Sequence, residues 1–391
     1  MSKGLILILH KKGSKSDLKN YRPIALLNTD LKIYTKCLAN RLKSLLGKTL
    51  HHLQYAAPGK RISSAINLVR DLFSSARESQ REAFIASVDF QKAFDSVNHH
   101  WLHRTMVKIG FPNHFVSLVS SINQSSSTKI LINGFESESV PLNRGVRQGD
   151  PLSLFLFLLS IQPFAAKIHH DRLIQGLHTP GGHVIKCPTY ADDVTLTLRN
   201  EWSVLRAFEL LDRCHKARGL QVNMLKTNGL FYRLLNSDHS TLPPIQWSEI
   251  ALELLGAAIG TNAEITTAWN TIYRKFKNIQ ISLSTRRLSY DAKSLLTKTK
   301  LLPVLSYTAA SYPLPSRIRQ KAITSTEIFF CRSDCLGIPN KVLALPFDRG
   351  GYNAAHTPTY CDLFFMRPIA SYASHRVHNQ SSTPETALIE N

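Results

Sequence analysis

The segment Tyr190–Asp193, which reads Tyr-Ala-Asp-Asp, places the strongest constraint on the fold of this chain. It lies between two runs of β-forming residues, His183–Cys187 and Val194–Leu198, so the pattern predicts a hairpin with these four residues at its turn. Asp192 and Asp193 would then carry adjacent carboxylates, which repel each other unless a cation lies between them. The sequence therefore predicts a turn that binds a divalent metal ion.

A third carboxylate comes from an upstream strand. Asp89 lies in the run Phe84–Phe90, whose apolar character is typical of a buried strand. If this strand pairs beside the hairpin, three carboxylates meet in space, as a two-metal site for phosphoryl transfer requires. The alternative is that all three are ordinary aspartates at turns and strand ends.

Further motifs accompany the aspartates in a fixed order. They are Leu7–Gly13, Asn20–Asn28, Ser87–Asn98, Asn143–Ser153, Gly219–Thr227, Leu255–Gly260 and Leu345–Gly351. In this order and spacing they resemble the reverse transcriptase of non-LTR (LINE-type) retrotransposons, over most of residues 5–370. Within the same enzyme class, a group II intron maturase or a telomerase-like enzyme is an alternative. The residue order in Lys92–Asp95 and Arg144–Pro151 favours the LINE type.

The resemblance implies an α+β fold of the right-hand polymerase type. Residues 1–83 would form the fingers and residues 84–261 the palm, an antiparallel sheet with packed helices and a fingers–palm insertion near 111–143. Residues 262–391 would form a mainly helical thumb and post-thumb region. The implied activity is RNA-directed DNA polymerisation, in which a primer 3′-hydroxyl attacks the α-phosphorus of a dNTP on an RNA template.

The resemblance also assigns metal ligands and a proton donor. Two Mg²⁺ ions, replaceable by Mn²⁺, would be bound by Asp89, Asp192, Asp193 and the carbonyl group of Phe90. Lys226 corresponds to the candidate general acid that protonates the leaving pyrophosphate. A solvated surface lysine is the alternative for Lys226.

Five residues match positions that contact the incoming nucleotide. Lys11 and Arg22 would hold the triphosphate, although basic residues in such a loop are also typical of solvated surface. Phe94 would lie under the sugar and exclude a 2′-hydroxyl, the alternative being a core phenylalanine. Gln148 and Gly149 would approach the base pair, unless they belong to a generic loop before a helix.

Five more residues are candidates for contact with the nucleic-acid strands. Arg144 and Arg147 flank the Gln148 motif and are expected to contact phosphates, or else to be surface residues. Gly256 belongs to the segment that resembles the primer grip. Arg286 and Arg287 lie in the basic, mainly helical region that begins near Asn262.

Composition favours a polyanionic partner. The chain of 391 residues has 48 Lys and Arg against 27 Asp and Glu, a net charge of +21. Residues 1–83 alone hold 16 Lys and Arg against 5 Asp and Glu. This excess predicts contact with the phosphates of a template and a primer, and we expect residues 1–83 and Arg274–Lys300 to line opposite walls of one groove. A solvated basic surface is the alternative.

Hydropathy and cysteine content indicate where in the cell the protein is expected. The apolar run Leu152–Ile161 is too short to span a bilayer, so no membrane partner is expected. Six scattered cysteines indicate reduced thiols in an intracellular protein. The family resemblance adds the expectation of the nucleus or a cytoplasmic ribonucleoprotein, if the chain is expressed. Cys331 and Cys335 have the spacing of a half zinc site, but no second pair follows.

Periodicity and stop signals predict several helices. The predicted spans are Asp30–Leu46 ended by Gly47, Ser63–Glu78, His99–Gly110, a helix over Leu152–Ile168 with Asp150 as its cap and Pro151 at its first position, and Ser203–Arg218 ended by Gly219. Each uses a glycine, a proline or a capping side chain as its boundary.

The chain also departs from the family pattern. It begins close to the first finger motif, and neither a Gly-rich finger segment nor an endonuclease precedes it. Gln54–Lys60 is one residue shorter than the corresponding family element and lacks its Gly-Phe pair. These departures suggest a truncated or decaying copy with a weakened template grip. The alternative function is therefore a catalytically impaired remnant that still binds nucleic acid.

Overall fold

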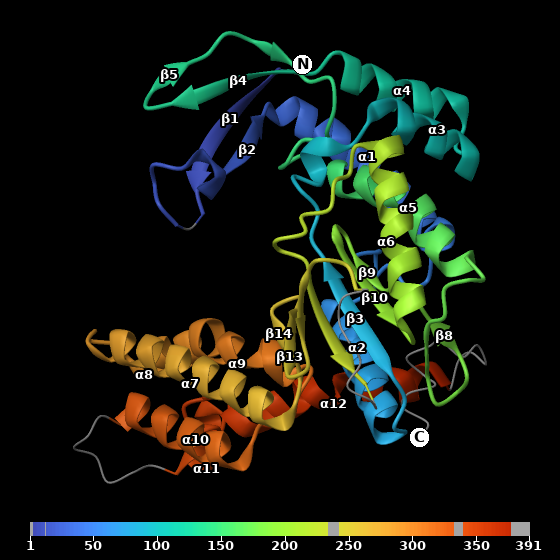
Figure 1. Ribbon diagram of the computed structural model, residues 1–391. Coiled ribbons are helices and arrows are strands. Elements are labelled where there is room, and N and C mark those ends of the chain that lie inside the picture. The colour runs from blue at the N-terminus through green and yellow to red at the C-terminus, as the bar shows by residue number, and fades with distance from the viewer. Residues whose placement is uncertain (1–2, 12, 234–241, 332–338, 377–391) are drawn as a thin grey trace. The chain divides into compact units, whose positions relative to one another are not determined.

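The computed structural model describes residues 3–11, 13–233, 242–331 and 339–376 (Figure 1). The chain forms two compact units, each described here by itself. Unit 1 comprises Met1–Ala65, Ala76–His178 and Val184–Trp247, and unit 2 comprises Ile66–Ser75, Thr179–His183 and Ser248–Asn391.

An antiparallel sheet forms the centre of unit 1. Its strands run in the order β12 (Gln246–Ser248), β11 (Asn228–Tyr232), β3 (Ala83–Val88), β10 (Asp193–Leu198) and β9 (Thr189–Tyr190). Strand β3 is flanked by β11 and β10, with Ser87 opposite Asn228 and Val88 opposite Val194. The run that carries Asp89 and the run that follows the Tyr-Ala-Asp-Asp segment thus pair side by side, as the sequence predicts.

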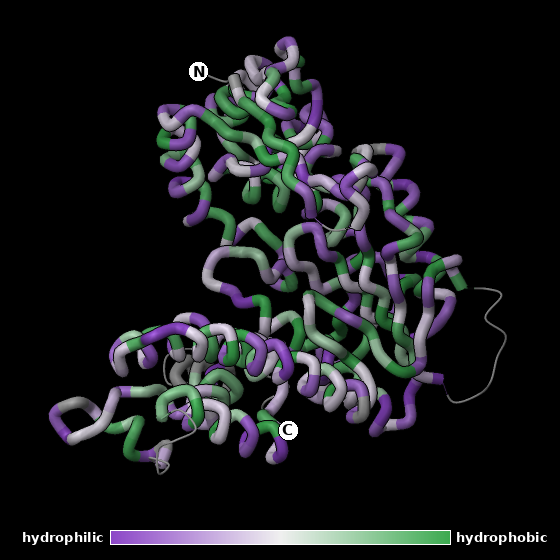
Figure 2. Tube along the Cα trace, turned by 90° about the vertical axis from the view of Figure 1, so that its left-hand side faces the viewer, coloured by the Kyte–Doolittle hydropathy of each residue, from purple (hydrophilic) through white to green (hydrophobic). Residues whose placement is uncertain are grey.

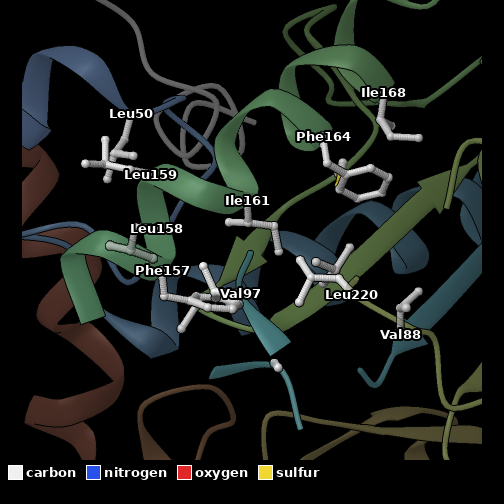
Figure 3. Packing of buried hydrophobic residues seen from close by; sticks show 14 of the residues in the cluster. Leu50, Val88, Val97, Phe157, Leu158, Leu159, Ile161, Phe164, Ile168 and Leu220 are labelled. Atoms are coloured by element: carbon white, nitrogen blue, oxygen red, sulfur yellow. The ribbon is translucent and has the colours of Figure 1, made fainter. Parts of the chain in front are cut away.

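Helix α5 (Ser153–His170) supplies much of the core beside this sheet. Its apolar residues recur around the whole helix and most of them are buried, as expected of a helix enclosed by its neighbours. Figure 3 shows Phe157, Ile161 and Phe164 extending from α5 toward Val97 and Leu220. Helices α1 (Thr29–Thr49), α3 (His99–Ile109) and α6 (Glu201–Arg218) also contact α5. This packing fixes the sheet that carries the aspartates.

A second sheet in unit 1 is built from the first strands and the predicted insertion. Strand β1 (Lys3–His10) pairs antiparallel with β2 (Tyr21–Leu27) and parallel with β4 (Ser127–Ile132). Strands β5 (Phe135–Glu136) and β6 (Val140–Pro141) pair with β4. Helix α4 (Asn113–Gln124), which the sequence analysis did not predict, precedes this hairpin.

Several helix boundaries follow the predicted signals and others do not. Helix α2 (Ile62–Glu78) begins at Ile62 and α6 at Glu201, ahead of the predicted Ser63 and Ser203. Gly110 and Gly219 end α3 and α6 in the left-handed conformation, with φ of 98° and 80°. Gly47 does not end α1, which continues to Thr49, because one glycine costs a helix only about 1 kcal/mol. The helix predicted from Pro151 begins at Ser153, since the Asp150 carboxylate accepts the Leu152 N–H within a preceding turn.

The strand predicted over His183–Cys187 is also corrected. Only β8 (Val184–Ile185) forms there, and it pairs with β7 (Leu177–His178) rather than within the Tyr-Ala-Asp-Asp hairpin. The hairpin arm is β9, directly after Pro188, which has no N–H to contribute to a strand ladder.

Unit 2 contains a hairpin and a set of helices, and α2 (Ile62–Glu78) contributes residues 66–75 to it. The hairpin pairs β13 (Ala251–Leu254) with β14 (Ala257–Gly260). The helical elements are α7 (Asn262–Ser284), α8 (Tyr290–Leu296), a π-helical turn (η4, Thr297–Leu301), α9 (Leu302–Ala309), α10 (Ser316–Cys331), α11 (Asn340–Leu343) and α12 (Thr357–Arg376). Figure 2 shows hydrophobic and hydrophilic residues interleaved along these helices, as expected of amphipathic helices around one core.

The structure can be compared with the predictions on membrane spans and on cysteines. Within the described ranges, no helix is long and apolar enough to cross a membrane. Cys37, Cys187, Cys214, Cys331 and Cys361 are free thiols. Cys335 lies outside the described residues.

Candidate active site

Three aspartates converge at one end of the central sheet of unit 1. Asp89 directly follows β3, and Asp193 is the first residue of β10. Because Val88 lies opposite Val194 in the antiparallel register, Asp89 and Asp193 extend the same pair of strands at the same end. Asp192 precedes Asp193 at the turn. The sequence prediction that the two motifs meet in space is therefore met by the strand pairing.

The charges of these carboxylates act on one another. Desolvation raises the pKa of Asp193 to about 6, with further contributions from the charges of Asp192 and Asp89. Burial likewise raises the pKa of Asp192, Asp89 adds to the effect, and the Arg22 guanidinium partly offsets it. The three groups thus form a site with excess negative charge, which a cation would relieve.

The donor set fits a hard divalent cation. Carboxylate oxygens are the ligands that Mg²⁺ prefers, and Mg²⁺ commonly keeps waters and binds substrate phosphates as well. Among the residues that the structure describes, no group of three His, Cys, Asp or Glu is arranged as a ready-made metal site. An arrangement of two or three carboxylates that is completed by water and substrate is consistent with both observations.

Asp89 is held by the segment Gly219–Thr227. Its N–H donates to the Thr227 hydroxyl at 3.2 Å, and its carbonyl accepts from the Asn223 N–H at 2.8 Å. Thr227 is fully buried and donates in turn to the Asn223 carbonyl at 2.9 Å. Phe90 bridges to Val222 in the same segment. The motif predicted to supply Lys226 thus also fixes Asp89, while Lys226 itself is exposed.

The turn that carries Asp192 is held by a residue that the sequence analysis did not single out. Ala191 has a φ of +53°, and its buried N–H donates to the Gln54 side-chain oxygen at 3.1 Å. Gln54 opens the element noted above as shortened. Its polar side chain in an otherwise apolar, buried stretch (Leu53–Ala57) is the one sequence signal that would have pointed to it.

The loop over residues 143–150 is held between the Phe94 segment and β2. The Val146 N–H donates to the Phe94 carbonyl at 2.8 Å, and the Ala25 N–H donates to the Gln148 carbonyl at 3.1 Å. A Cβ on Gly149 would lie 2.9 Å from the Ala25 carbonyl oxygen, at a φ of +104°, so this close approach requires glycine. A cavity of about 390 Å³ lies beside the loop and is lined in part by Ala25, Arg144 and Gln148.

The two arginines of this loop differ. Arg144 is exposed, whereas the Arg147 side chain is only 9% exposed and pairs with Asp150 at 3.3 Å. Burial lowers the pKa of Arg147 despite that pairing. This geometry gives Arg147 a role in holding the loop, and its contact with phosphates stays a prediction.

The predicted nucleotide contacts lie in unit 1 as well. Arg22 is an exposed residue of β2, opposite Leu9 of β1, and Lys11 is exposed just after β1. Phe94 is half-buried and stacks on Phe157, with ring centroids 4.6 Å apart. Its ring therefore packs on the core, and its partial exposure leaves the sugar contact as a prediction.

Three predicted nucleic-acid contacts belong to unit 2. Gly256 has a φ of +79° and follows Leu255, whose φ is +51°, in the turn between β13 and β14. Arg286 and Arg287 are exposed residues just after α7. The primer-grip segment is thus a hairpin, and both arginines are accessible to solvent.

Comparison with protein families gives one match over most of unit 1. Residues 9–259 match the reverse transcriptase (RNA-dependent DNA polymerase) family. Members of this family generally use divalent metal ions.

Three curated proteins of mobile elements are similar to the chain. A 149 kDa protein of transposon TX1 from Xenopus laevis, described as uncharacterized, is 34% identical over 65% of this chain and 20% of its own length. A Pol polyprotein from the type-1 retrotransposable element R2 of Popillia japonica is 28% identical over 56% of this chain and 31% of its own. The RNA-directed DNA polymerase from mobile element jockey of Drosophila melanogaster is 28% identical over 52% and 22%. The chain thus spans less than a third of these relatives.

A solved structure supports the fold. Apo telomerase from Candida tropicalis superposes with a TM-score of 0.52 at 10% identity, over 99% of this chain and 69% of that chain. At this identity the likeness bears on the fold alone. With the family match, it confirms the right-hand polymerase fold, and the TX1, R2 and jockey relatives confirm the resemblance to non-LTR retrotransposon enzymes.

Proposed function

Because this chain belongs to the reverse transcriptase (RNA-dependent DNA polymerase) family, we propose that it extends a DNA primer with dNTPs on an RNA template. The observation that carries the proposal is the convergence of Asp89, Asp192 and Asp193 at one end of the β3–β10 pair. Their mutual repulsion favours the binding of cations at that end of the sheet. Phosphoryl-transfer sites use bound divalent cations to stabilise negative charge on the reacting phosphate.

Asp89, Asp192 and Asp193, together with the Phe90 carbonyl, are the proposed ligands of two Mg²⁺ ions, for which Mn²⁺ is a substitute. When bound, such ions neutralise the charge that develops on the attacking and leaving oxygens. The chain's own contribution is to hold the carboxylates in place through the Thr227 hydrogen bond to Asp89 and the strand pairing of Val194.

The nucleotide is proposed to lie between β2 and the Phe94 segment. Arg22, whose charge already acts on Asp192, and Lys11 would hold the triphosphate. Phe94 would support the sugar, and the loop backbone at Gln148 and Gly149 would face the base pair. Lys226 is close in sequence to Thr227, which fixes Asp89, and is proposed to donate a proton to pyrophosphate.

The nucleic-acid strands are proposed to contact exposed basic residues and the unit 2 hairpin. Arg144, Arg286 and Arg287 are the proposed phosphate contacts, and Gly256 shapes the hairpin at the primer end. Arg147 is a further proposed phosphate contact, one that also pairs with Asp150. In domain terms we propose fingers at 1–83, palm at 84–261 and thumb at 262–391, in an intracellular protein of the nucleus or a cytoplasmic ribonucleoprotein.

A primer-extension assay distinguishes this function from a binding remnant. The chain is incubated with a DNA primer annealed to an RNA template, with dNTPs and Mg²⁺, and with Asp89→Asn as the matched inactive variant. The proposal expects extension that follows the template sequence and stops when Mg²⁺ is chelated. A chain that retards the primer–template on a gel but extends it no further than Asp89→Asn would be the nucleic-acid-binding remnant.

A further inference from the structure

Gln54 makes an unusual pair of hydrogen bonds for a buried side chain. It is 2% exposed, and one of its side-chain atoms accepts from the Ala191 N–H at 3.1 Å and from the Ala56 N–H at 3.0 Å. Two donors converge on this atom, so it must be the amide oxygen and not the nitrogen. The Gln54 amide orientation is thus fixed by the backbone around it.

The hydrogen bond reaches the most constrained point of the Tyr-Ala-Asp-Asp turn. Ala191 is buried and has a φ of +53°, a conformation that residues with a Cβ adopt rarely. Its N–H is out of contact with water, so it needs a protein acceptor. The next two residues are Asp192 and Asp193, whose carboxylate directions follow from the backbone at Ala191.

The acceptor itself sits on a rigid support. The Thr189 N–H donates to the Leu53 carbonyl at 2.9 Å, and the Tyr55 N–H donates to the Thr189 carbonyl at 2.7 Å. Gln54 therefore lies parallel to Thr189, the first residue of β9, with which it forms a bridge. The segment Leu53–Tyr55 thus pairs with β9 through one isolated bridge, and the Gln54 side chain extends from it to the turn.

We propose that Gln54 is a positioning residue that aims the Asp192 and Asp193 carboxylates for divalent-metal binding through the Ala191 N–H. Gln54 acts on the backbone of the turn and not on substrate or metal. The kinetic consequence rests on the proposed polymerase function, whereas the consequence for metal affinity does not. The shortened element Gln54–Lys60 then helps to hold the aspartate turn in place, independently of any contact with the template.

The test compares three variants with the parent chain. Gln54→Met keeps the size of the side chain and removes the acceptor, and Gln54→Glu keeps an acceptor oxygen. Gln280→Met is the matched control, since Gln280 is also a glutamine 2% exposed but lies in α7 of unit 2. Mn²⁺ affinity is measured by electron paramagnetic resonance without nucleic acid, and single-turnover extension and primer–template affinity are measured separately.

We expect Gln54→Met to weaken Mn²⁺ binding and to slow extension by about 10- to 100-fold, with primer–template affinity unchanged. Gln54→Glu should stay within about threefold of the parent chain, and Gln280→Met should match it. If Gln54→Met does not fold, Gln54→Asn replaces it, because its shorter side chain withdraws the oxygen from Ala191.

Unchanged Mn²⁺ affinity in Gln54→Met would overturn the proposal, as would equal losses of metal and primer–template affinity that Gln280→Met shares. A parent chain that extends primers while Gln54→Met is unaffected rejects only the positioning role. A parent chain whose Mn²⁺ affinity is lowered by Gln54→Met but that extends nothing rejects only the polymerase function.

Discussion

The hairpins β9–β10 and β13–β14 have turns with the same unusual backbone conformation but with different surroundings. Each turn contains a residue with a Cβ at positive φ, Ala191 at +53° and Leu255 at +51°. The first turn is held through its N–H, which donates to Gln54. The second is held through carbonyls, because the Tyr307 hydroxyl donates to Leu255 and the Tyr312 hydroxyl donates to Ala258 at 2.6 Å.

The difference lies in what each turn presents. Two carboxylates follow the first turn, so small backbone shifts there change the placement of charge. The second turn continues into Gly256 and two alanines, and a Cβ on Gly260 would lie 2.2 Å from the Ile250 carbonyl oxygen. No charged side chain follows the second turn in β14, so the second hairpin can contact a ligand there mainly through its backbone. One hairpin should control metal and chemistry, and the other should control the grip on the primer.

The largest expected effect comes from removing a carboxylate of the first hairpin. Asp192→Asn should lower single-turnover extension by at least about 10³-fold, because the side chain keeps its shape but loses its charge at the metal site. Thermal stability and primer–template affinity should stay near those of the parent chain. Asp212→Asn is the matched control, since Asp212 is an exposed residue of α6 paired with Lys216. Extension by Asp192→Asn within tenfold of the parent would remove the metal assignment.

A second expected effect concerns the Phe94 ring, which packs on Phe157 of α5. Phe94→Ala should raise the use of ribonucleotides relative to deoxynucleotides by about tenfold or more, because the side chain that opposes a 2′-hydroxyl is lost. The measurement is competition between the two nucleotide types in single-turnover extension. If the selectivity ratio is unchanged, the stacking of Phe94 on Phe157 is its whole role.

A third prediction tests the second hairpin. Tyr312→Phe leaves the Ala258 carbonyl without its donor and should weaken binding of the primer terminus by about three- to tenfold. Mn²⁺ affinity should not change. Tyr273→Phe is the control, because that hydroxyl bonds Ser325 within the helices of unit 2 and does not reach the hairpin. A loss of Mn²⁺ affinity in Tyr312→Phe would contradict the division of roles between the hairpins.

The salt dependence of binding measures the phosphate contacts of unit 2. Each contact contributes a slope of roughly 0.7 to 0.9 in a plot of log affinity against log salt. Replacing Arg286 and Arg287 together by alanine should flatten the slope by about one to two units, with little dependence on sequence. An unaltered slope would make these arginines part of a solvated surface.

The smallest predicted effect is a loss of folding stability at low pH that originates from His51, in the segment next to the first hairpin. Burial and the neighbouring charges of His52, His169, His170 and Lys60 lower the pKa of His51 to about 3. The His51 Nδ1 also accepts the Leu53 N–H at 3.2 Å, in the segment that supports β9. The folded pKa lies below the unfolded one, so stability is complete above about pH 6.5 and is lost as pH falls toward 3.

The expected loss is at most about 1.4 kcal/mol of unfolding free energy per pH unit for His51. Thermal unfolding of the parent chain and of His51→Asn is measured between pH 7.5 and pH 5. The variant should lose less stability over this range than the parent. Some loss should remain, because burial also lowers the pKa of His169. Parallel pH profiles for the two proteins would contradict the prediction.

The parts of the fold that the sequence predicts are those set by local chemistry. The strands next to Asp89 and Asp193 follow from short apolar runs, and the turn before β10 follows from its adjacent carboxylates. The ends of α3 and α6 follow from Gly110 and Gly219, because a glycine adopts the left-handed conformation without a steric cost.

The parts that escaped prediction depend on contacts between distant segments. Gln54 lies 137 residues from Ala191, and nothing local indicates that its amide reaches the turn. Arg147 looks like a free cation in sequence, but its pairing with Asp150 and its burial appear only once the loop is folded. Gly47 has a stop signal that continued packing of α1 overrides, since Leu46 is fully buried there.

Divalent-metal binding by the aspartate cluster tests the central claim most directly. Mn²⁺ is titrated into the parent chain, Asp89→Asn, Asp192→Asn and the control Asp212→Asn, without nucleic acid or nucleotide, and free Mn²⁺ is followed by electron paramagnetic resonance. We predict that Asp89→Asn and Asp192→Asn each weaken binding by about tenfold or more, while Asp212→Asn binds as the parent does. Equal Mn²⁺ affinity in all four proteins would contradict the assignment of these aspartates as the metal-binding centre.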